Sequence, residues 1–221
     1  MSNDIHIKKG LDIKLKGAAE KTLEKAVLSN FYTLIPEDFH GVIPKLISKV
    51  GSKVKAGEPV FYDKSNESVK FVSPVAGEII EIARGEKRRI LSIKLQASSE
   101  QTYHDYGVFD FNAAKPEAIK AHLLAAGCWP FVKQRPYDVI ANPDRTPKGI
   151  FISGYASAPL AADLDFTLQG KEAALQAAVT ALGKLTTGKV HVSVGVNSNS
   201  PLAGLSGIAL HKVSGPHPSG N

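Results

Sequence analysis

Apolar positions in the first part of the chain follow the two-residue period of β-strands. Those between residues 5 and 15 alternate loosely with polar positions and are Ile5, Ile7, Leu11, Ile13 and Leu15. They predict an opening strand with a break at Gly10. The apolar stretch 26–35 predicts another strand or a pair, and the short apolar runs within 42–95 predict a β-sandwich. The polar run 96–103 predicts a linker.

The most informative stretch runs from Val54 to Leu95, where two short apolar strands each follow a glycine. We expect Gly57 and Gly77 in tight turns, because glycine adopts positive φ without a Cβ penalty. Pro59 and Pro74 cannot donate a ladder hydrogen bond, so we expect them at strand starts or edges. This spacing is typical of small β-sandwiches of the lipoyl/biotinyl type.

An Asp63-Lys64 pair lies between those two strands. In carrier domains such a pair occupies a hairpin tip, and the lysine takes a prosthetic group. Here the link from Lys64 to Ser73 is longer than lipoyl domains use, and residues 65–67 are ordinary turn residues. The pair therefore predicts a solvated hairpin tip, with a modified lysine as the alternative.

The apolar period becomes helical after residue 115. Residues 116–126 predict a helix, with a proline in its first turn and a glycine directly after its end. Residues 149–153 predict a short strand, residues 171–182 an amphipathic helix capped by Gly183, and residues 190–194 an alternating strand. Strand, helix and strand in this order predict a right-handed βαβ unit with a parallel pair.

The sequence therefore predicts a mixed α+β fold in two domains. Residues 1–104 should form the N-terminal strands and the barrel-sandwich domain, and residues 105–221 an α/β domain. Only two parallel strands are convincing in the second domain, so we expect it to be truncated at its C-terminal end. The loop 154–170 leaves the carboxyl end of a strand, where open α/β sheets usually bind ligands.

Charge and composition narrow the classes of function. The net charge is +6 with acidic residues interleaved, and the basic run 87–89 has no aromatic neighbour in the sequence, so nucleic acid is not an expected partner. That run predicts a hairpin tip that is solvated, docks on an acidic partner or lies at a membrane surface. The single Cys128 cannot form an internal disulfide, which favours a reducing compartment. No stretch approaches the ~20 apolar residues of a membrane span.

Motifs for cofactors and metals are missing. The segment after residue 153 holds one glycine, Gly154, instead of a G-x-G-x-x-G fingerprint, so NAD or flavin binding is not expected. The seven histidines are scattered and show no metal-binding spacing. Asp163 and Asp165 suit acid–base chemistry, although loop carboxylates before a helix N-terminus are the simpler interpretation.

One segment suits a flat, apolar, redox-active ligand. Residues 128–137 mix rings, cations and prolines, and a quinone head group needs aromatic walls with one or two hydrogen-bond donors. The loop 31–40 is similar in character. The candidate quinone-binding residues are Phe39, His40, Trp129, Phe131, Lys133, Arg135 and Tyr137. In the competing interpretation, Trp129 and Phe131 are core residues that pin helix 116–126 to the sheet.

Several stretches carry a family resemblance through their order and spacing, including Gly57-Glu-Pro-Val, Ser73-Pro-Val-Ala-Gly and Ser214-Gly-Pro-His-Pro. The full set is 7–18, 49–61, 63–64, 69–77, 84–88, 135–136, 159–163, 188–190 and 214–218. Over essentially its whole length the chain resembles the A subunit of the Na⁺-translocating NADH:quinone reductase. The family chain continues well past residue 221.

The resemblance implies a peripheral subunit on the cytoplasmic face of the bacterial inner membrane, without a transmembrane segment and with only indirect membrane contact. It implies a carrier-like sandwich that holds no lipoyl or biotin group, a partial Rossmann-like domain, and a role in quinone binding and complex assembly. NADH, flavins, the iron–sulfur cluster and Na⁺ would be handled by the other subunits, its partners, so the chain should be inactive alone.

Three rival functions stay open at this point. The C subunit of an Rnf-type electron-transport complex shares both halves of this architecture, but it would carry cysteine-rich iron–sulfur motifs further along. A non-enzymatic lipoyl-like binding or carrier module is a second alternative. A free-standing flavin dehydrogenase is a third.

Overall fold

The computed structural model describes residues 3–220 and divides into two compact units. The sandwich unit consists of Lys25–Phe109 and Glu117–Arg145, and the α/β unit consists of Met1–Glu24, Asp110–Pro116 and Thr146–Asn221. The predicted division after residue 104 is linear, whereas these compact units interleave along the chain. The predicted mixed fold is confirmed.

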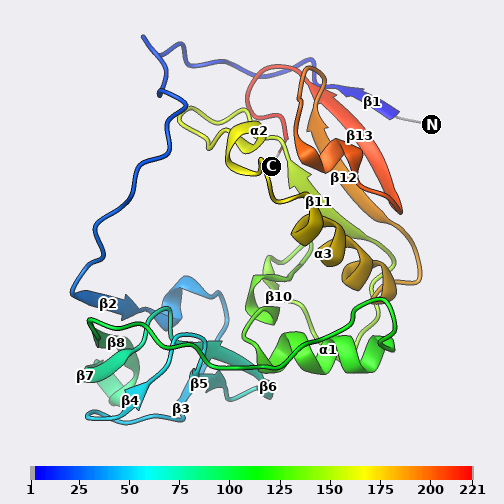
Figure 1. Cartoon of the computed structure of the whole chain (residues 1–221). Coiled ribbons are helices and arrows are strands. Elements are labelled where there is room, and N and C mark those ends of the chain that lie inside the picture. The colour runs from blue at the N-terminus through cyan, green and yellow to red at the C-terminus, as the bar shows by residue number, and fades with distance from the viewer. Residues whose placement is uncertain (1–2, 221) are drawn as a thin grey trace. The chain divides into compact units, whose positions relative to one another are not determined.

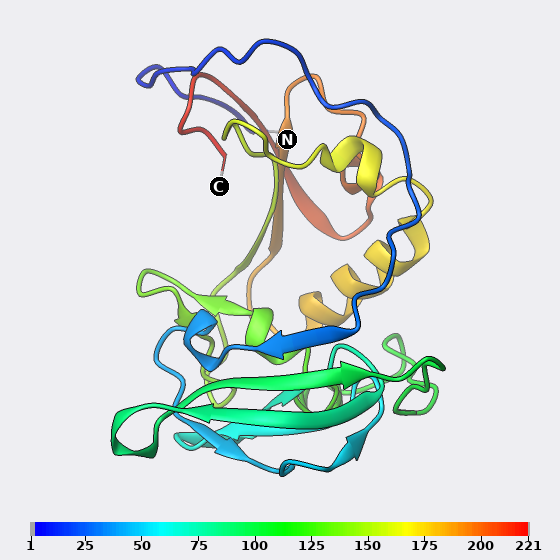
Figure 2. The same ribbon diagram turned by 90° about the vertical axis from the view of Figure 1, so that its left-hand side faces the viewer.

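The sandwich unit contains two antiparallel sheets (Figure 2). The first has the order β2 (Phe31–Leu34), β8 (Ile90–Ala97), β7 (Gly77–Arg84) and β4 (Lys53–Val54). The second has the order β3 (Pro44–Leu46), β5 (Pro59–Asp63) and β6 (Asn66–Val72). The fully buried side chains of the sandwich unit come from both sheets and include Phe61, Ile79, Ile93 and Leu95. Short 3₁₀ turns follow β2 (η1, Pro36–Asp38) and β7 (η2, Glu86–Arg88).

A helical segment completes this unit. Helix α1 (Pro116–Ala125) buries Ile119 and Leu124 and ends before Gly127, whose φ is +68°. A Cβ added at Gly127 would lie 2.5 Å from the Val72 side chain, so the turn after α1 approaches β6 closely. Then come η3 (Trp129–Phe131) and a small hairpin of β9 (Lys133–Gln134) and β10 (Val139–Ile140).

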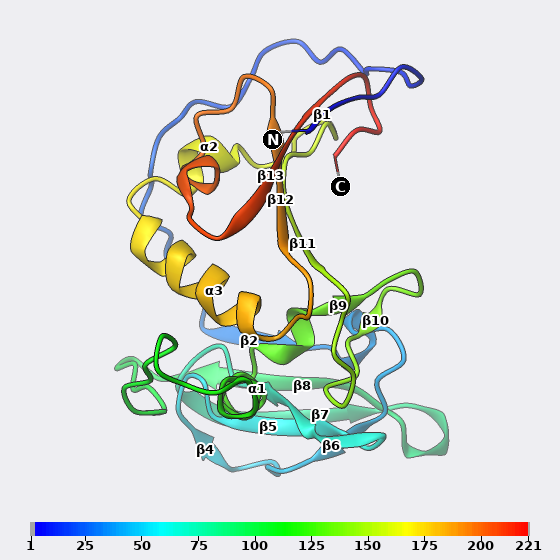
Figure 3. The same cartoon turned by 90° about the vertical axis from the view of Figure 1, so that its right-hand side faces the viewer.

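The α/β unit is built on a four-stranded parallel sheet (Figure 1). Its order is β1 (Asn3–His6), β13 (Ile208–Ser214), β12 (Val190–Gly195) and β11 (Ile150–Gly154). Helix α3 (Glu172–Lys184) lies along one face, where Leu175 and Leu182 pack against the buried valines of β12 (Figure 3). Short helix α2 (Leu164–Thr167) and η4 (Pro201–Gly204) lie in the connecting loops.

Several predicted elements are confirmed. Helix 116–126, the 149–153 strand and the 190–194 strand correspond to α1, β11 and β12, and β11 pairs parallel to β12 as expected. Gly57 has a φ of +84°, Pro59 begins β5, and Asp63 and Lys64 lie at the turn between β5 and β6. The basic run 87–89 lies at the tip of the β7–β8 hairpin, as predicted.

The opening strand was predicted wrongly in extent. Only Asn3–His6 forms a strand, and it joins the α/β sheet beside β13 instead of the sandwich. The stretch 26–35 supplies a single strand of four residues, β2. The sequence reasoning also missed β13, so the α/β unit has four parallel strands where two were expected.

Two glycines were assigned the wrong role. Gly77 is buried at the start of β7, where a Cβ would lie 2.1 Å from the Gln96 carbonyl oxygen, so close strand approach and not a turn requires glycine there. Gly183 lies inside α3, which continues to Lys184 with Leu185 as its C-cap. Among the helices of residues 3–220, none has the length and apolarity that a membrane span requires.

Candidate functional site

Four phenylalanines in the sandwich unit form a continuous series that we call the aromatic cluster. Phe61 and Phe71 are buried and stack with centroids 4.4 Å apart. Phe39 packs edge-on against Phe71 at 4.7 Å and against Phe131 at 6.0 Å. Phe131, at the end of η3, is 74% exposed. The cluster therefore runs from the sandwich core to the protein surface.

A lysine lies beside the outer part of this cluster. Lys133 follows η3 on β9, and its Nζ atom is 5.9 Å from the centroid of the Phe39 ring. An ammonium over an aromatic face is held by the ring quadrupole, and it keeps three hydrogen-bond donors. The outer rings and Lys133 thus offer apolar surfaces and one cationic donor at a single place. This combination suits a planar apolar ligand with a carbonyl oxygen.

The structure brings together some predicted site residues and separates others. Phe39, Phe131 and Lys133 meet, whereas Trp129 is 5% exposed and donates its Nε1–H to the Ala141 carbonyl at 2.7 Å. The core interpretation therefore holds for Trp129 but is wrong for Phe131. His40 is exposed after η1.

Arg135 and Tyr137 occupy the turn of the β9–β10 hairpin, where both are exposed and Arg135 lies 3.7 Å from the Asp138 carboxylate. Sequence reasoning missed Phe71, which is hidden in an ordinary apolar strand and is distant in sequence from the residues it contacts. Only knowledge of the β5–β6 pairing would have placed it beside Phe61.

A second candidate site is a pocket of about 470 Å³ at the carboxyl edge of the parallel sheet, which we call the edge pocket. The ends of β11, β12 and β13 contribute to it, as the position of the 154–170 loop predicts. Its lining includes Gly154, Tyr155, Asp163, Asp165, Ser198 and Ser214. Among residues 3–220, the lining holds two carboxylates and neither lysine nor arginine, so this part of the edge pocket is poorly suited to a phosphate group.

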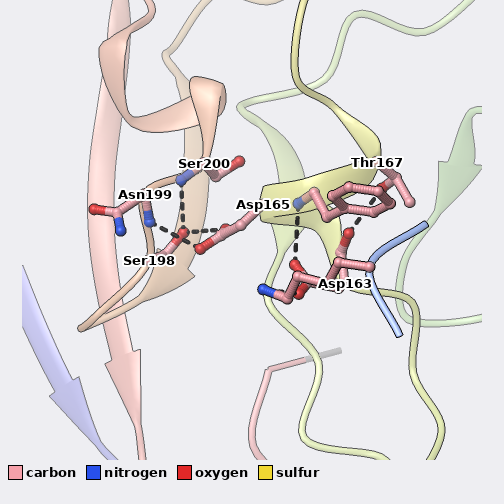
Figure 4. A network of polar contacts seen from close by, with 8 residues as sticks. Asp163, Asp165, Thr167, Ser198, Asn199 and Ser200 are labelled. Atoms are coloured by element: carbon pink, nitrogen blue, oxygen red, sulfur yellow. Dashed lines mark hydrogen bonds and ion pairs between the residues drawn. The ribbon is translucent and has the colours of Figure 1, made fainter. Parts of the chain in front are cut away.

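The two carboxylates of the edge pocket hold its loops together (Figure 4). Asp163 caps α2, where its Oδ1 accepts from the Phe166 N–H at 3.0 Å, and its Oδ2 lies 2.7 Å from Lys21 Nζ. Asp165 accepts from the Ser198 hydroxyl at 2.5 Å and from the Asn199 N–H at 2.8 Å. Both groups therefore act as acceptors for the protein itself.

The electrostatics of Asp163 argue against acid–base work. The hydrogen bond from Lys21, followed by that from the Phe166 N–H, holds the pKa of the Asp163 carboxyl below its usual value. General acids and bases near neutral pH need carboxyls with a raised pKa. Asp163 is the N-cap of α2 and Asp165 lies in its first turn, so the geometry favours the interpretation of both as structural carboxylates at a helix N-terminus.

Two histidines that are far apart in the sequence meet on the α/β sheet. His191 Nδ1 lies 2.9 Å from His211 Nε2, and Phe151 stacks on His191 with centroids 4.7 Å apart. Within residues 3–220, however, no group of three or more histidine, cysteine, aspartate or glutamate side chains is arranged to hold a metal ion.

Lys64 is exposed in the tight turn between β5 and β6. Asp63 organises this turn, because its carboxylate accepts from the Ser65 N–H, the Ser65 hydroxyl and the Ile43 N–H. The predicted hairpin tip with ordinary turn chemistry is confirmed, and a modification of Lys64 stays an untested alternative.

Two family models match this chain, one over most of each predicted domain. A model described as the NqrA N-terminal barrel-sandwich hybrid domain matches residues 5–98, and one described as the NqrA second alpha/beta domain matches residues 114–221. The chain belongs to the NqrA family. This agrees with the predicted resemblance and with the order of the two folds, and it favours the NqrA family over the C subunit of an Rnf-type complex.

Curated NqrA relatives match along the whole chain. Proteins named as the A subunit of Na(+)-translocating NADH-quinone reductase, from Pseudomonas aeruginosa, Yersinia pseudotuberculosis and Photorhabdus laumondii, are 34%, 32% and 33% identical to it over 218 residues. Each match covers 98% of this chain and 48–49% of the relative. The chain thus spans about half the length of the curated relatives it matches.

Proposed function

We propose that this chain serves as the NqrA component of a sodium-pumping NADH:quinone reductase. The observation that carries the proposal is the match of 98% of the chain to relatives with that name. Its partners are then the other subunits of the complex, and its place is peripheral, on the cytoplasmic face of the bacterial inner membrane. NADH, flavins, the iron–sulfur cluster and Na⁺ are handled by those subunits, and the chain is active only within the complex.

Within that role, the chain contributes to quinone binding through the aromatic cluster. The exposed ring of Phe131 and the half-buried ring of Phe39 offer faces to a quinone head group, and Lys133 can donate to a quinone carbonyl oxygen. The buried rings of Phe61 and Phe71 hold Phe39 in place from below. The residues of the chain thus bind and orient the quinone, and the electrons come from other subunits.

A titration with a soluble ubiquinone or menaquinone analogue tests quinone binding, first on the purified chain and then on the assembled complex. Trp129 is the only tryptophan of this chain and lies in η3 with Phe131, so its fluorescence is a local signal in the purified chain, and the complex is titrated by the quinone dependence of its activity. We expect saturable quenching, and Phe131→Ala should weaken the apparent affinity by about fivefold, since one aromatic contact contributes roughly 1 kcal/mol.

Phe151→Ala is the matched control, because Phe151 is an equally exposed phenylalanine, at 78%, on the α/β unit. Its affinity should equal that of the unchanged protein. Equal affinities in both variants, or no saturable signal in an assembled and active complex, would show that the quinone binds elsewhere. Failure of the chain to assemble with membrane subunits would contradict the broader proposal instead.

A further inference from the structure

The parallel sheet of the α/β unit has one covered face and one face that we call the open face. On the covered face, α3, η4 and Leu168, the C-cap of α2, contribute to the core around the buried valines of β12 (Figure 3). Ile152 of β11 packs against the same core, so its neighbour Phe151 points to the opposite side of the sheet. The helices of the α/β unit within residues 3–220 thus all contribute to one face and leave the other open.

The open face carries an exposed aromatic ring and no lysine, arginine, aspartate or glutamate on its described strands. Phe151 is 78% exposed and stacks on His191, whose Nδ1 lies 2.9 Å from His211 Nε2. By strand register the face also holds Ile5, Ser153, Ser193, Ala209 and Val213. Parallel sheets of α/β proteins occur almost only with both faces covered, so we expect a protein layer over this face.

The direction of the chain explains why this face is open. From β11 through α3 to β12, and from β12 through η4 to β13, the chain steps the same way across the sheet. Right-handed crossovers that step in one direction lie on the same face, which here is the face of α3. A right-handed crossover covers the open face only if it steps in the opposite direction, from the β13 side back past β11.

The edge at β11 is where a strand after such a crossover would pair. Beside β13 the sheet is occupied by β1, whereas on the other side its order ends at β11 within residues 3–220. The Ile150 N–H donates to the Lys189 carbonyl on the β12 side at 3.1 Å, so the N–H groups of Phe151 and Ser153 point to the free edge. A strand added beyond β1 would instead continue the first direction and leave the open face bare.

We propose that the open face and the β11 edge receive further polypeptide of the same chain, which crosses the face as a helix and adds a parallel strand beside β11. This rests on the proposed function, because each match covers only 48–49% of relatives named as the A subunit. The two matched models are described as the N-terminal and the second domain, so the additional half follows them in those relatives. A helix is the usual crossover between parallel strands, and its apolar side would bury Phe151.

Charge and topology favour this occupant over two others. An anionic membrane surface attracts basic side chains, and the described strands place no lysine or arginine on the open face. A second copy that pairs at the β11 edge extends the sheet without covering the open face, and one that lies on the open face leaves the edge unpaired. A crossover within the same chain satisfies the face and the edge together.

Photo-cross-linking in the full-length protein, which includes the additional half, identifies what lies over the open face. Phe151→p-benzoylphenylalanine keeps an aromatic side chain at the exposed position, and mass spectrometry of the digested protein maps its partner. We expect an intrachain link to the half that follows residue 221. Tyr103→p-benzoylphenylalanine, at an aromatic residue of the sandwich unit that is 73% exposed, is the matched control and should not form that link.

Other partners would overturn the inference. A link from position 151 to a second copy, to the sandwich unit or to another subunit would assign the open face to that partner. The absence of any protein link would show that the face is solvated. The proposed function is tested separately, since it fails if the unchanged full-length protein does not assemble with the other subunits of the reductase.

Hydrogen exchange resolved to single amides tests the added strand. If a strand pairs at β11 in the full-length protein, the amides of Phe151 and Ser153 should exchange about as slowly as those of Ile150 and Ile152, which point toward β12. At a free edge they would exchange about tenfold faster or more than these neighbours, and that result would overturn the inference.

Discussion

The two units of this chain are built from contacts of opposite range. In the sandwich unit, β5 and β6 pair around the turn at Lys64, and β7 and β8 pair around the tip at residues 85–89. In the α/β unit, β1 pairs with β13, so that His6 contacts Ser214 across 208 positions. Hairpin pairing is encoded by neighbouring residues, whereas the edge of the parallel sheet exists only after the whole chain has folded.

We therefore expect a destabilising substitution in one unit to affect mainly that unit. The sandwich unit should respond most strongly to changes at its crowded strand contacts. The parallel sheet should respond to changes at the contacts that join its distant segments. Crowded glycines supply a matched test in each unit, because one methyl group is added in both cases.

The largest effect is expected at Gly77. In Gly77→Ala the new methyl group would lie 2.1 Å from the Gln96 carbonyl oxygen, which is backbone and cannot rotate away. We expect a loss of about 3 kcal/mol in the free energy of unfolding. Trp129 fluorescence during urea unfolding measures it, since Trp129 belongs to the sandwich unit.

Gly188→Ala is the counterpart in the α/β unit, where the methyl group would lie 2.0 Å from the Lys148 carbonyl oxygen. Hydrogen exchange should show faster opening of β12 in this variant and of β7 in Gly77→Ala. Gly204→Ala is the control, because a Cβ there meets nothing within 4 Å, and its stability should stay within about 0.5 kcal/mol. If each crowded variant opened both units equally, the units would be one cooperative block and the comparison would fail.

Sequence reasoning succeeded where the determinants are local. The turn at Asp63 and Lys64, the Gly57 turn and helix α1 with its terminal glycine all follow from neighbouring residues. It failed at β13 and at residues 11–15, which alternate like a strand but form none, because an alternating pattern does not say which strand lies beside it. Gly77 was misjudged for a related reason, since the crowding atom belongs to Gln96 on another strand.

Some residues of the aromatic cluster could also be predicted from the sequence, and others could not. The sequence indicated that residues 128–137 carry rings and cations, and Phe131 and Lys133 do meet Phe39. It did not separate the buried Trp129 from the exposed Phe131, because residue type alone does not fix burial. It did not indicate Phe71, the buried ring that contacts Phe39, because the sequence of β6 has no feature typical of a ligand site.

An effect of intermediate size on the free energy of unfolding should distinguish Trp129 from Phe131. Trp129→Phe keeps an aromatic ring but leaves the Ala141 carbonyl without the indole N–H donor, so we expect a loss of about 1–2 kcal/mol in the free energy of unfolding. Phe131→Ala should change it by no more than about 0.5 kcal/mol, because that ring is mostly exposed. Thermal unfolding followed by circular dichroism measures both.

The opposite ranking would contradict the assignment of Trp129 to the core and of Phe131 to the outer part of the aromatic cluster. Trp129→Tyr sharpens the result, since it restores a polar hydrogen at the ring edge. Partial recovery of stability in that variant would identify the lost hydrogen bond, and not the change of ring size, as the cause.

The smallest effect concerns the ion pair that ties the N-terminal segment to α2. The Lys21 hydrogen bond lowers the pKa of Asp163, and the hydrogen bond to Asp163 raises the pKa of Lys21. A carboxyl with a lowered pKa in the folded state contributes stability above its unfolded pKa, and loses it as the pH falls through the folded pKa. Lys21, whose pKa is raised in the folded state, contributes stability below its unfolded pKa. That stability is lost as the pH rises through the folded pKa of Lys21.

The Lys21–Asp163 ion pair should therefore persist through neutral pH and weaken only at the acid and alkaline extremes. Its loss should change the global stability little, because both groups are exposed. A ¹³C NMR titration of the Asp163 carboxyl measures this, and Lys21→Met should move its midpoint upward toward that of an ordinary aspartate. Lys25→Met is the control, since Lys25 has no ion pair within residues 3–220. An unchanged midpoint in Lys21→Met would show that the backbone N–H of Phe166, and not Lys21, lowers the pKa of Asp163.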